Sequence, residues 1–281
     1  MPRADAGESR AASEVRSGSV LAEYKTRDGV DGSRLSVHAQ FIEAEGVSYD
    51  TALEALEVWH PDWELDRGAC SLRAGDRSAQ ADSSKIRLDL LDLGPISVQG
   101  PTDSLELEPR RLPDLLSAFS GVIYGTEGEL DYDRAPLPYE PGATYRFEAP
   151  GTETVDGFTV ELEAPAPVRI DAVAGRSAQG VDSIELPADG DMKVSWQAAV
   201  DDAAVFLDLS SGFGPDRPRL TCRVEDDGQF TIPSGLLEQF DVQSGVDVAV
   251  RRVHAEDARV QGFDDSEVIL SAVDEVTVYR R

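Results

Sequence analysis

The stretch from Ser183 to Pro233, SIELPADGDMKVSWQAAVDDAAVFLDLSSGFGPDRPRLTCRVEDDGQFTIP, decides the fold. Its apolar residues alternate with polar ones in short runs, which acidic and glycine-rich turns separate. Because successive side chains of a strand point to opposite faces, Met192, Val194 and Trp196 share one face. The pattern predicts a β-sandwich in which Trp196 fills the space between two sheets, as in immunoglobulin-like domains. Its expected core includes Val194, Trp196, Leu207 and Val248.

The rest of the chain predicts a mainly β protein of two β-sandwich-like, immunoglobulin-like domains with short helical insertions. Residues 1–19 are rich in Ala, Ser, Gly and charge, so we expect a flexible tail there. Residues 20–150 form the expected β-rich N-terminal domain. Residues 151–281 form the expected immunoglobulin-like sandwich, since the alternation restarts after the Pro150-Gly151 turn.

Local signals refine this picture at three places. Residues 50–58 favour a short helix over an irregular strand. Residues 234–240 predict a short helix capped by Ser234. Residues 267–279 predict the last strand, or two strands with a break near Asp274.

The charge of the chain limits its partners. The formal net charge is −28, from 54 acidic and 26 Lys and Arg residues. Nucleic acids and anionic membranes are poor partners for such a surface, because both are bound through Lys and Arg. One interpretation is an exported protein kept soluble by its charge; the alternative is a cytoplasmic protein adapted to high salt, where charge repulsion is screened.

Two cysteines, Cys70 and Cys222, are too few for a disulfide scaffold. They lie in different predicted domains, and the sequence is compatible both with a disulfide between them and with two buried free thiols. The sequence contains no apolar run of the ~20 residues that a membrane helix needs. The first residues lack the apolar core of a signal peptide, which favours the mature part of an exported protein or a cytoplasmic one.

The sequence predicts no catalytic residue and no cofactor. The histidines His38, His60 and His254 have no metal-ligand spacing, and phosphate-binding and nucleophile motifs are absent. Calcium is the one alternative, because it binds loop oxygens and acidic pairs recur in predicted loops. These pairs are Asp131 and Asp133, Asp189 and Asp191, Asp226 and Asp227, and Asp264 and Asp265.

Trp59 and Trp63 flank Pro61 in a predicted loop. Exposed aromatic side chains there would stack on sugars or anchor a protein partner. Alternatively, the two tryptophans cover the edge of the first sheet.

Three stretches carry a resemblance: Leu91 to Pro101 (LDLGPISVQGP), Tyr145 to Gly151 (YRFEAPG) and Leu220 to Pro233 (LTCRVEDDGQFTIP). They resemble uncharacterised exported proteins of predatory and gliding proteobacteria, many of them lipoproteins. The resemblance covers the chain from about residue 30 and implies export and a two-part β architecture. It offers no catalytic pattern, and the chain lacks the N-terminal lipid-bearing cysteine.

Together these observations predict a non-enzymatic exported protein with a structural, surface or binding role. Its partner would be a protein, a glycan surface or a second copy paired through strand edges. The alternatives are a hydrolase that acts on polysaccharide or peptidoglycan through loop carboxylates, and a calcium-dependent adhesin-like module.

Overall fold

Most strands of the protein belong to one long, curved sheet. The computed structural model describes residues 15–26, 34–45, 59–73, 87–111, 119–126, 137–187, 190–212 and 217–280. The long sheet has twelve strands in the order β3-β17-β16-β19-β20-β1-β2-β4-β8-β7, with β14 also paired to β20 and β9 to β2. Its strands are β1 (Val15–Lys25), β2 (Arg34–Glu45), β3 (Cys70–Arg73), β4 (Arg87–Leu90), β7 (Arg110–Arg111), β8 (Phe119–Gly125), β9 (Leu137–Pro138), β14 (Ser183–Glu185), β16 (Ala204–Ser210), β17 (Arg219–Val224), β19 (Val246–Asp257) and β20 (Asp265–Tyr279).

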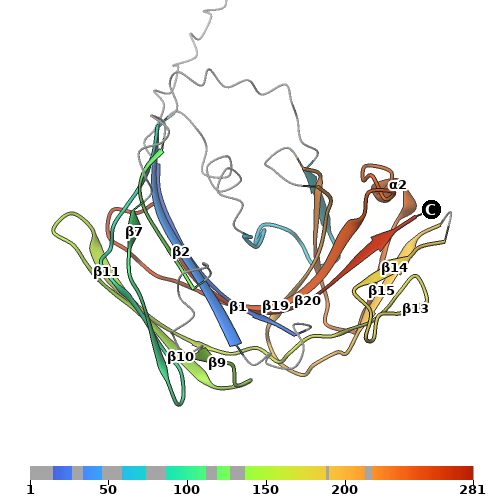
Figure 1. Ribbon diagram of the computed structural model, residues 1–281, viewed down its shortest axis with the longest axis horizontal. Helices are drawn as coiled ribbons and strands as arrows, with labels where there is room; N and C mark the ends of the chain where they lie inside the picture. Colours follow the sequence, from blue (N-terminus) through green and yellow to red (C-terminus); the bar gives the residue numbers. More distant parts are fainter. Residues whose placement is uncertain are drawn as a thin grey trace, which may run out of the picture.

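Two four-stranded sheets pack against the outer side of this curve (Figure 1). The first lobe is closed by the sheet β11-β10-β5-β6 and the second by β13-β12-β15-β18. Their strands are β5 (Ile96–Gln99), β6 (Ser104–Leu107), β10 (Thr144–Gly151), β11 (Asp156–Glu163), β12 (Ile170–Val173), β13 (Arg176–Ser177), β15 (Met192–Trp196) and β18 (Gln229–Ile232). The predicted mainly β, sandwich-like fold is confirmed.

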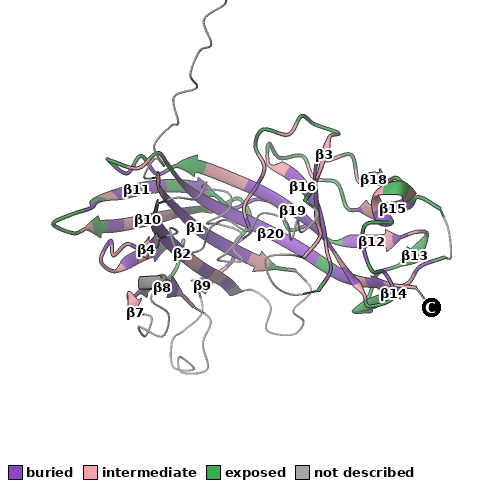
Figure 2. Ribbon diagram, turned by 90° about the horizontal axis from the view of Figure 1, so that it is seen from above, coloured by how far each residue is buried: buried purple, intermediate pink, exposed green. Residues whose placement is uncertain are grey.

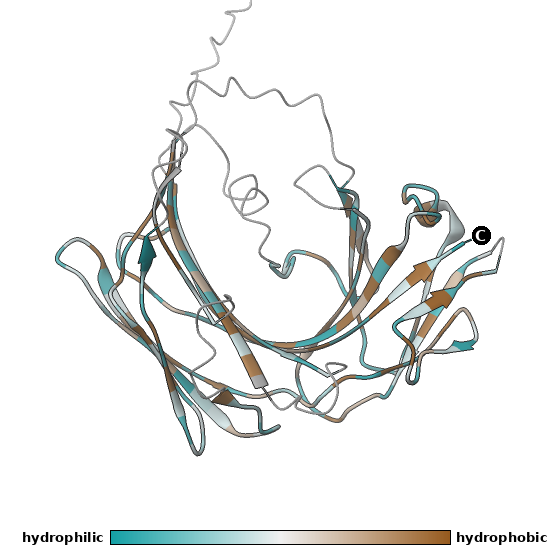
Figure 3. Cartoon of the chain, viewed as in Figure 1, coloured by the Kyte–Doolittle hydropathy of each residue, from teal (hydrophilic) through white to brown (hydrophobic). Residues whose placement is uncertain are grey.

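Each lobe has its own hydrophobic core between its two sheets. The first core contains Phe41, Tyr124 and Phe147. The second core contains the four residues expected from the sequence, all of them buried: Val194, Trp196, Leu207 and Val248. Apolar and hydrophilic residues interchange along the strands, as expected for sheets that are buried on one face (Figure 3).

The strand β20 joins the two lobes. Its fifteen residues pair with β19 on one side and with β1, in parallel, on the other. Val268 and Leu270 enter the first core, while Val276 and Val278 enter the second. The central strands of the long sheet are accordingly buried along most of their length (Figure 2).

A tyrosine corner fixes the start of β10 in the first lobe. The Tyr145 hydroxyl donates to the Pro138 carbonyl at 2.7 Å and accepts from the Glu140 backbone N–H at 2.9 Å. Such a hydroxyl bond back to the preceding backbone is a feature of immunoglobulin-like sandwiches. Burial raises the pKa of Tyr145 further above its usual value, so the hydroxyl also keeps its proton at moderately alkaline pH.

The predicted domain boundary at residue 151 falls inside the first lobe. The strands β10 and β11 form one hairpin, in which Ala149 pairs with Phe158 and Gly151 with Asp156. The passage between lobes comes later, because Ala164 packs in the first core and Val168 in the second. A Pro-Gly bend within a hairpin has the same composition as a linker, which is why the sequence misplaced the boundary.

The expected tail also ends earlier than predicted. The strand β1 begins at Val15, and Ser17 and Ser19 are buried between β2 and β20. This segment is extended because it is hydrogen-bonded to a strand on each side. Those strands are distant in the sequence, so the polar composition of the segment does not indicate the pairing.

Of the two alternatives for residues 267–279, the single strand is observed, whereas the predicted cap of the short helix needs correction. The strand β20 is unbroken at Asp274, whose carboxylate accepts a hydrogen bond from the Ile170 backbone N–H at 2.7 Å. The helix α2 (Ser234–Leu237) has Pro233 at its N-cap and no side-chain cap. The Ser234 backbone N–H instead donates to Asp191 at 2.9 Å. The predicted helix over residues 50–58 lies outside the described residues.

We expect Gly121→Ala to destabilise the protein by about 2–4 kcal/mol. Gly121 has a φ of 120°, and a Cβ there would overlap the Leu90 carbonyl on the neighbouring strand β4. The matched control is Gly175→Ala, with a φ of 75° but open space around the Cβ. Equal losses of unfolding free energy in urea would show that the overlap with Leu90 is not real.

Candidate binding site

Residues 59–69, hereafter the strap, lie on the concave side of the long sheet, opposite the two cores (Figure 1). The strap leads directly into β3, the edge strand beyond β17. Its end is held by backbone bonds from Gly68 N to Arg223 O at 2.7 Å and from Arg223 N to Ala69 O at 3.1 Å. The strap therefore contacts sheet residues whose side chains point to the face opposite the second core.

Trp59 is a buried part of this contact. Its side chain is 8% exposed and packs edge-on against Phe206, with ring centroids 5.9 Å apart. Its indole N–H donates to Asp208 at 2.9 Å, and the Arg251 guanidinium lies 4.7 Å from its ring centroid. A buried Trp needs such a partner for its N–H. Trp59 thus covers the sheet, which was the second of the two interpretations of the sequence.

Trp63 is the exposed tryptophan of the pair. Trp63 is 37% exposed, although its ring packs edge-on against Phe206, with ring centroids 5.4 Å apart. Its indole N–H donates to Glu267 at 3.0 Å. Arg223 lies 5.8 Å from its ring centroid and donates to the carbonyls of Trp63 and Leu65. Trp63 is therefore held in one orientation while part of its surface faces solvent.

A buried ion cluster lies beneath Trp59. Arg251 forms ion pairs with Glu23 and Asp208, and the Thr221 hydroxyl donates to Asp208 at 2.7 Å. Burial alone would lower the pKa of Arg251, but the two carboxylates raise it above its usual value. The cation therefore stays charged, and Asp208 connects it to the strap through Trp59.

The end of the β19–β20 hairpin next to Trp63 is acidic. His60 Nδ1 lies 2.7 Å from Oε1 of Glu267, the residue that accepts the Trp63 indole N–H. Burial, then the charge of Glu267, raises the pKa of the neighbouring Asp265. Asp257, which pairs with Glu267, adds a third carboxylate at this end of the hairpin.

A disulfide joins Cys70, the first residue after the strap, to Cys222. The two residues face each other across β3 and β17. Of the two possibilities left open by the sequence, the structure shows the disulfide rather than two free thiols. Chain segments placed in different predicted domains are therefore neighbours. Disulfides persist in oxidising compartments, which points to an extracytoplasmic location.

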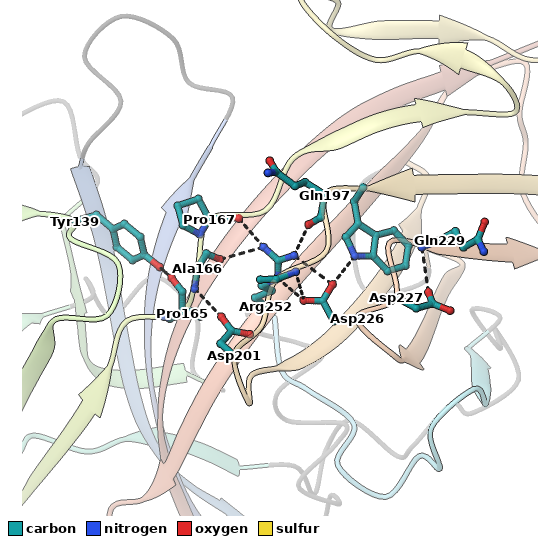
Figure 4. A network of polar contacts seen from close by, with 12 residues as sticks. Tyr139, Pro165, Ala166, Pro167, Gln197, Asp201, Asp226, Asp227, Gln229 and Arg252 are labelled. Atoms are coloured by element: carbon teal, nitrogen blue, oxygen red, sulfur yellow. Dashed lines mark hydrogen bonds and ion pairs between the residues drawn. The ribbon is translucent and has the colours of Figure 1, made fainter.

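A second polar centre lies on the outer side, where the lobes meet (Figure 4). The buried Arg252 donates to Asp226 from Nε at 2.8 Å and from Nη2 at 3.2 Å. Its remaining bonds go to the carbonyls of Ala166, Pro167 and Gln197. Because residues 166 and 167 lie on the passage between the lobes, Arg252 holds that passage against β19.

Asp226 is one of the acids considered for calcium. Its carboxylate instead accepts hydrogen bonds from Arg252, from the Trp196 indole at 2.8 Å and from the Ala199 N–H at 3.2 Å. Burial raises its pKa, but the bonds from Arg252 and Trp196 outweigh this, and the pKa lies below its usual value. Asp226 therefore stabilises the lobe junction as an anion.

The depressed pKa of Asp226 predicts a pH dependence. Such a carboxylate stabilises the fold above the pKa of the unfolded chain, about 4, and loses that contribution as pH falls through the folded pKa. We expect the difference in unfolding free energy between wild type and Asp226→Asn to shrink below about pH 4. Urea unfolding at a series of pH values measures it, and a difference independent of pH would contradict the assignment.

The other candidate metal ligands lie apart from one another or contact other groups of the protein. His254 contacts the Glu163 carbonyl at 2.7 Å and Asp202 at 3.2 Å, and Asp264 accepts from the Arg16 N–H. Asp131, Asp133 and Asp189 lie outside the described residues. Over the ranges that the structure describes, no three His, Cys, Asp or Glu side chains are grouped to hold a metal. Within the same ranges, no helix has the length and apolarity to cross a membrane.

Sequence reasoning missed the buried charges Asp208, Arg251 and Arg252. The signal was present, because two arginines interrupt the apolar run VDVAVRRV and one aspartate interrupts VFLDL. A charge inside a strand that is apolar on both faces predicts a buried ion pair. Its partner on another strand could not be identified without the register.

Comparisons with known proteins give no family. No family model matches the chain, and no curated protein matches it. The solved structures that match include the FN1–FN3 domains of chicken CNTN1, at 12% identity with a TM-score of 0.21. The match covers 77% of this chain and 64% of that chain. The predicted relation to exported proteobacterial proteins stays a prediction, and the fold assignment rests on the strand pairings.

Proposed function

We propose that this protein is a non-enzymatic, exported binding protein whose contact surface is the outer side of the strap. One observation carries the proposal: Trp63 is fixed by its neighbours yet keeps 37% of its surface exposed. Tryptophan is among the residues that most often dominate binding energy at protein interfaces. A side chain already held in one orientation loses little entropy when a partner binds.

The surroundings of Trp63 support this role. Its indole N–H, its carbonyl and its ring contact Glu267, Arg223 and Phe206, respectively. Phe206 and Glu267 belong to central strands of the long sheet, and the disulfide closes the far end of the strap. A site on such rigid elements is better preorganised than one on a free loop.

Three carboxylates next to the strap have structural contacts, which supports a binding role for them rather than hydrolysis. Glu23 and Asp208 are bound to Arg251, and Glu267 is bound to His60 and Trp63. A glycosidase needs two carboxylates that face one substrate, one of them able to donate a proton. Those three carboxylates instead hold the strap and the ion cluster in place.

Binding and turnover measurements test the proposal together. Wild type and Trp63→Ala are applied to peptide and oligosaccharide arrays and assayed with generic glycoside and ester substrates. We expect binding that Trp63→Ala weakens by about tenfold or more, consistent with the loss of a hot-spot residue. Turnover abolished by a single carboxylate substitution would overturn the non-enzymatic assignment.

A further inference from the structure

We infer that the strap binds a cationic polypeptide segment, whose Lys or Arg side chains dock beside Trp63 against the acidic end of the β19–β20 hairpin. This inference rests on the proposed binding function and specifies the chemistry of the partner. It combines three features of the same surface: an immobilised aromatic ring, an excess of carboxylates and a rigid support.

The carboxylates come from the sheet and from the strap. Asp257 and Glu267 are paired across β19 and β20, and Asp265 lies two residues before Glu267 on the same face. Of the nearby cations, Arg259 approaches Asp257 at 3.9 Å, and Arg223 donates to the carbonyls of Trp63 and Leu65. The sheet therefore presents more negative than positive charge beside Trp63.

The strap adds acids of its own around the exposed ring. Asp62, Glu64 and Asp66 surround Trp63 in the sequence, and Glu64 and Asp66 are exposed. The exposed Arg67 forms an ion pair of 3.3 Å with Glu225. These acids lie on the strap itself, next to the carboxylates of the sheet.

An aromatic ring beside carboxylates fits a Lys or Arg side chain. The ring attracts the cation and packs against its methylene chain, while the carboxylates supply long-range attraction. Arg223 already lies over the Trp63 ring at 5.8 Å, an intramolecular example of the same contact. Sulfated or phosphorylated polymers would be repelled, and a neutral sugar would gain nothing from the excess of negative charge.

A single peptide scaffold in three charge forms tests the inference. Fluorescein-labelled glycine–serine peptides that carry lysine, glutamine or glutamate at the same positions are titrated with the full chain by fluorescence anisotropy. We expect only the lysine form to bind, with affinity that falls steeply as salt rises. Trp63→Ala should weaken binding about tenfold or more, and Trp63→Phe should retain most of it.

Matched charge variants distinguish binding at this site from nonspecific attraction to a chain with a net charge of −28. Asp257→Asn with Asp265→Asn should weaken lysine-peptide binding at low salt by about threefold to tenfold. Glu153→Gln with Asp156→Asn makes the same charge change at exposed residues of the first lobe and should leave binding within about twofold. Equal effects of the two pairs would overturn the inference.

The remaining outcomes distinguish this inference from the proposed function. Lysine-peptide binding that Trp63→Ala leaves unchanged would overturn the cationic-partner inference. Trp63-dependent binding of a chitin or cellulose oligosaccharide, without binding of the lysine peptide, would overturn it while the binding function stands. If neither peptides nor oligosaccharides bind in a Trp63-dependent way, both proposals fail.

Discussion

Replacing Arg252 with methionine is expected to lower the free energy of unfolding by about 3–5 kcal/mol, the usual cost of breaking a buried ion pair. The substitution leaves the Asp226 carboxylate without its cation and removes the donor from three carbonyls at the lobe junction. Methionine replaces much of the side-chain volume, so the loss reports polar contacts rather than a cavity.

Thermal and urea unfolding measure this effect. A loss of this size corresponds to a fall in Tm of roughly 6–12 °C for a chain of this length. Arg176→Met is the control, because Arg176 is exposed on β13 and should change stability by less than about 0.5 kcal/mol. A small effect at both positions would show that Arg252 does not hold the junction.

Removal of the disulfide should have the largest effect of all. The bridge joins residues 152 positions apart, and chain-entropy arguments assign a loop of that length about 5 kcal/mol. We expect Cys70→Ala with Cys222→Ala to lose most of this energy and to release the strap. Released strap residues would become sensitive to protease, because β3 is an edge strand with four residues.

A dithiol reductant provides the control for the disulfide prediction. Reduction adds two electrons and two protons to the bridge and should bring the wild type to the stability of the double variant. The reductant should not change the double variant itself. A wild type that keeps its stability after complete reduction, shown by thiol titration, would contradict the role assigned to the bridge.

Short-range patterns in the sequence predicted the strands but not their neighbours. The alternation around Val194 and Trp196 predicted a sandwich core correctly, because alternation reports directly which face is buried. The pairing of β1 with β20 joins residues at opposite ends of the chain, and no local pattern encodes it. The two domains were therefore predicted as separate, whereas the long sheet runs through both lobes.

The candidate site was predictable only in part. The sequence singled out Trp59 and Trp63 because they flank Pro61, but it could not tell which one is buried. That difference depends on Asp208 and Glu267, which accept the two indole N–H groups from strands far away in the sequence. The Cys70–Cys222 pairing likewise follows from the place of β3 beside β17.

The central claim is that the strap buries Trp59 and presents Trp63, and acrylamide quenching of tryptophan fluorescence tests it most directly. The chain has three tryptophans, so single Trp→Phe variants isolate each contribution by difference. We predict that Trp63→Phe removes most of the quenchable emission, whereas Trp59→Phe and Trp196→Phe remove little of it. Quenchable emission that survives in Trp63→Phe and disappears in Trp59→Phe would contradict the account.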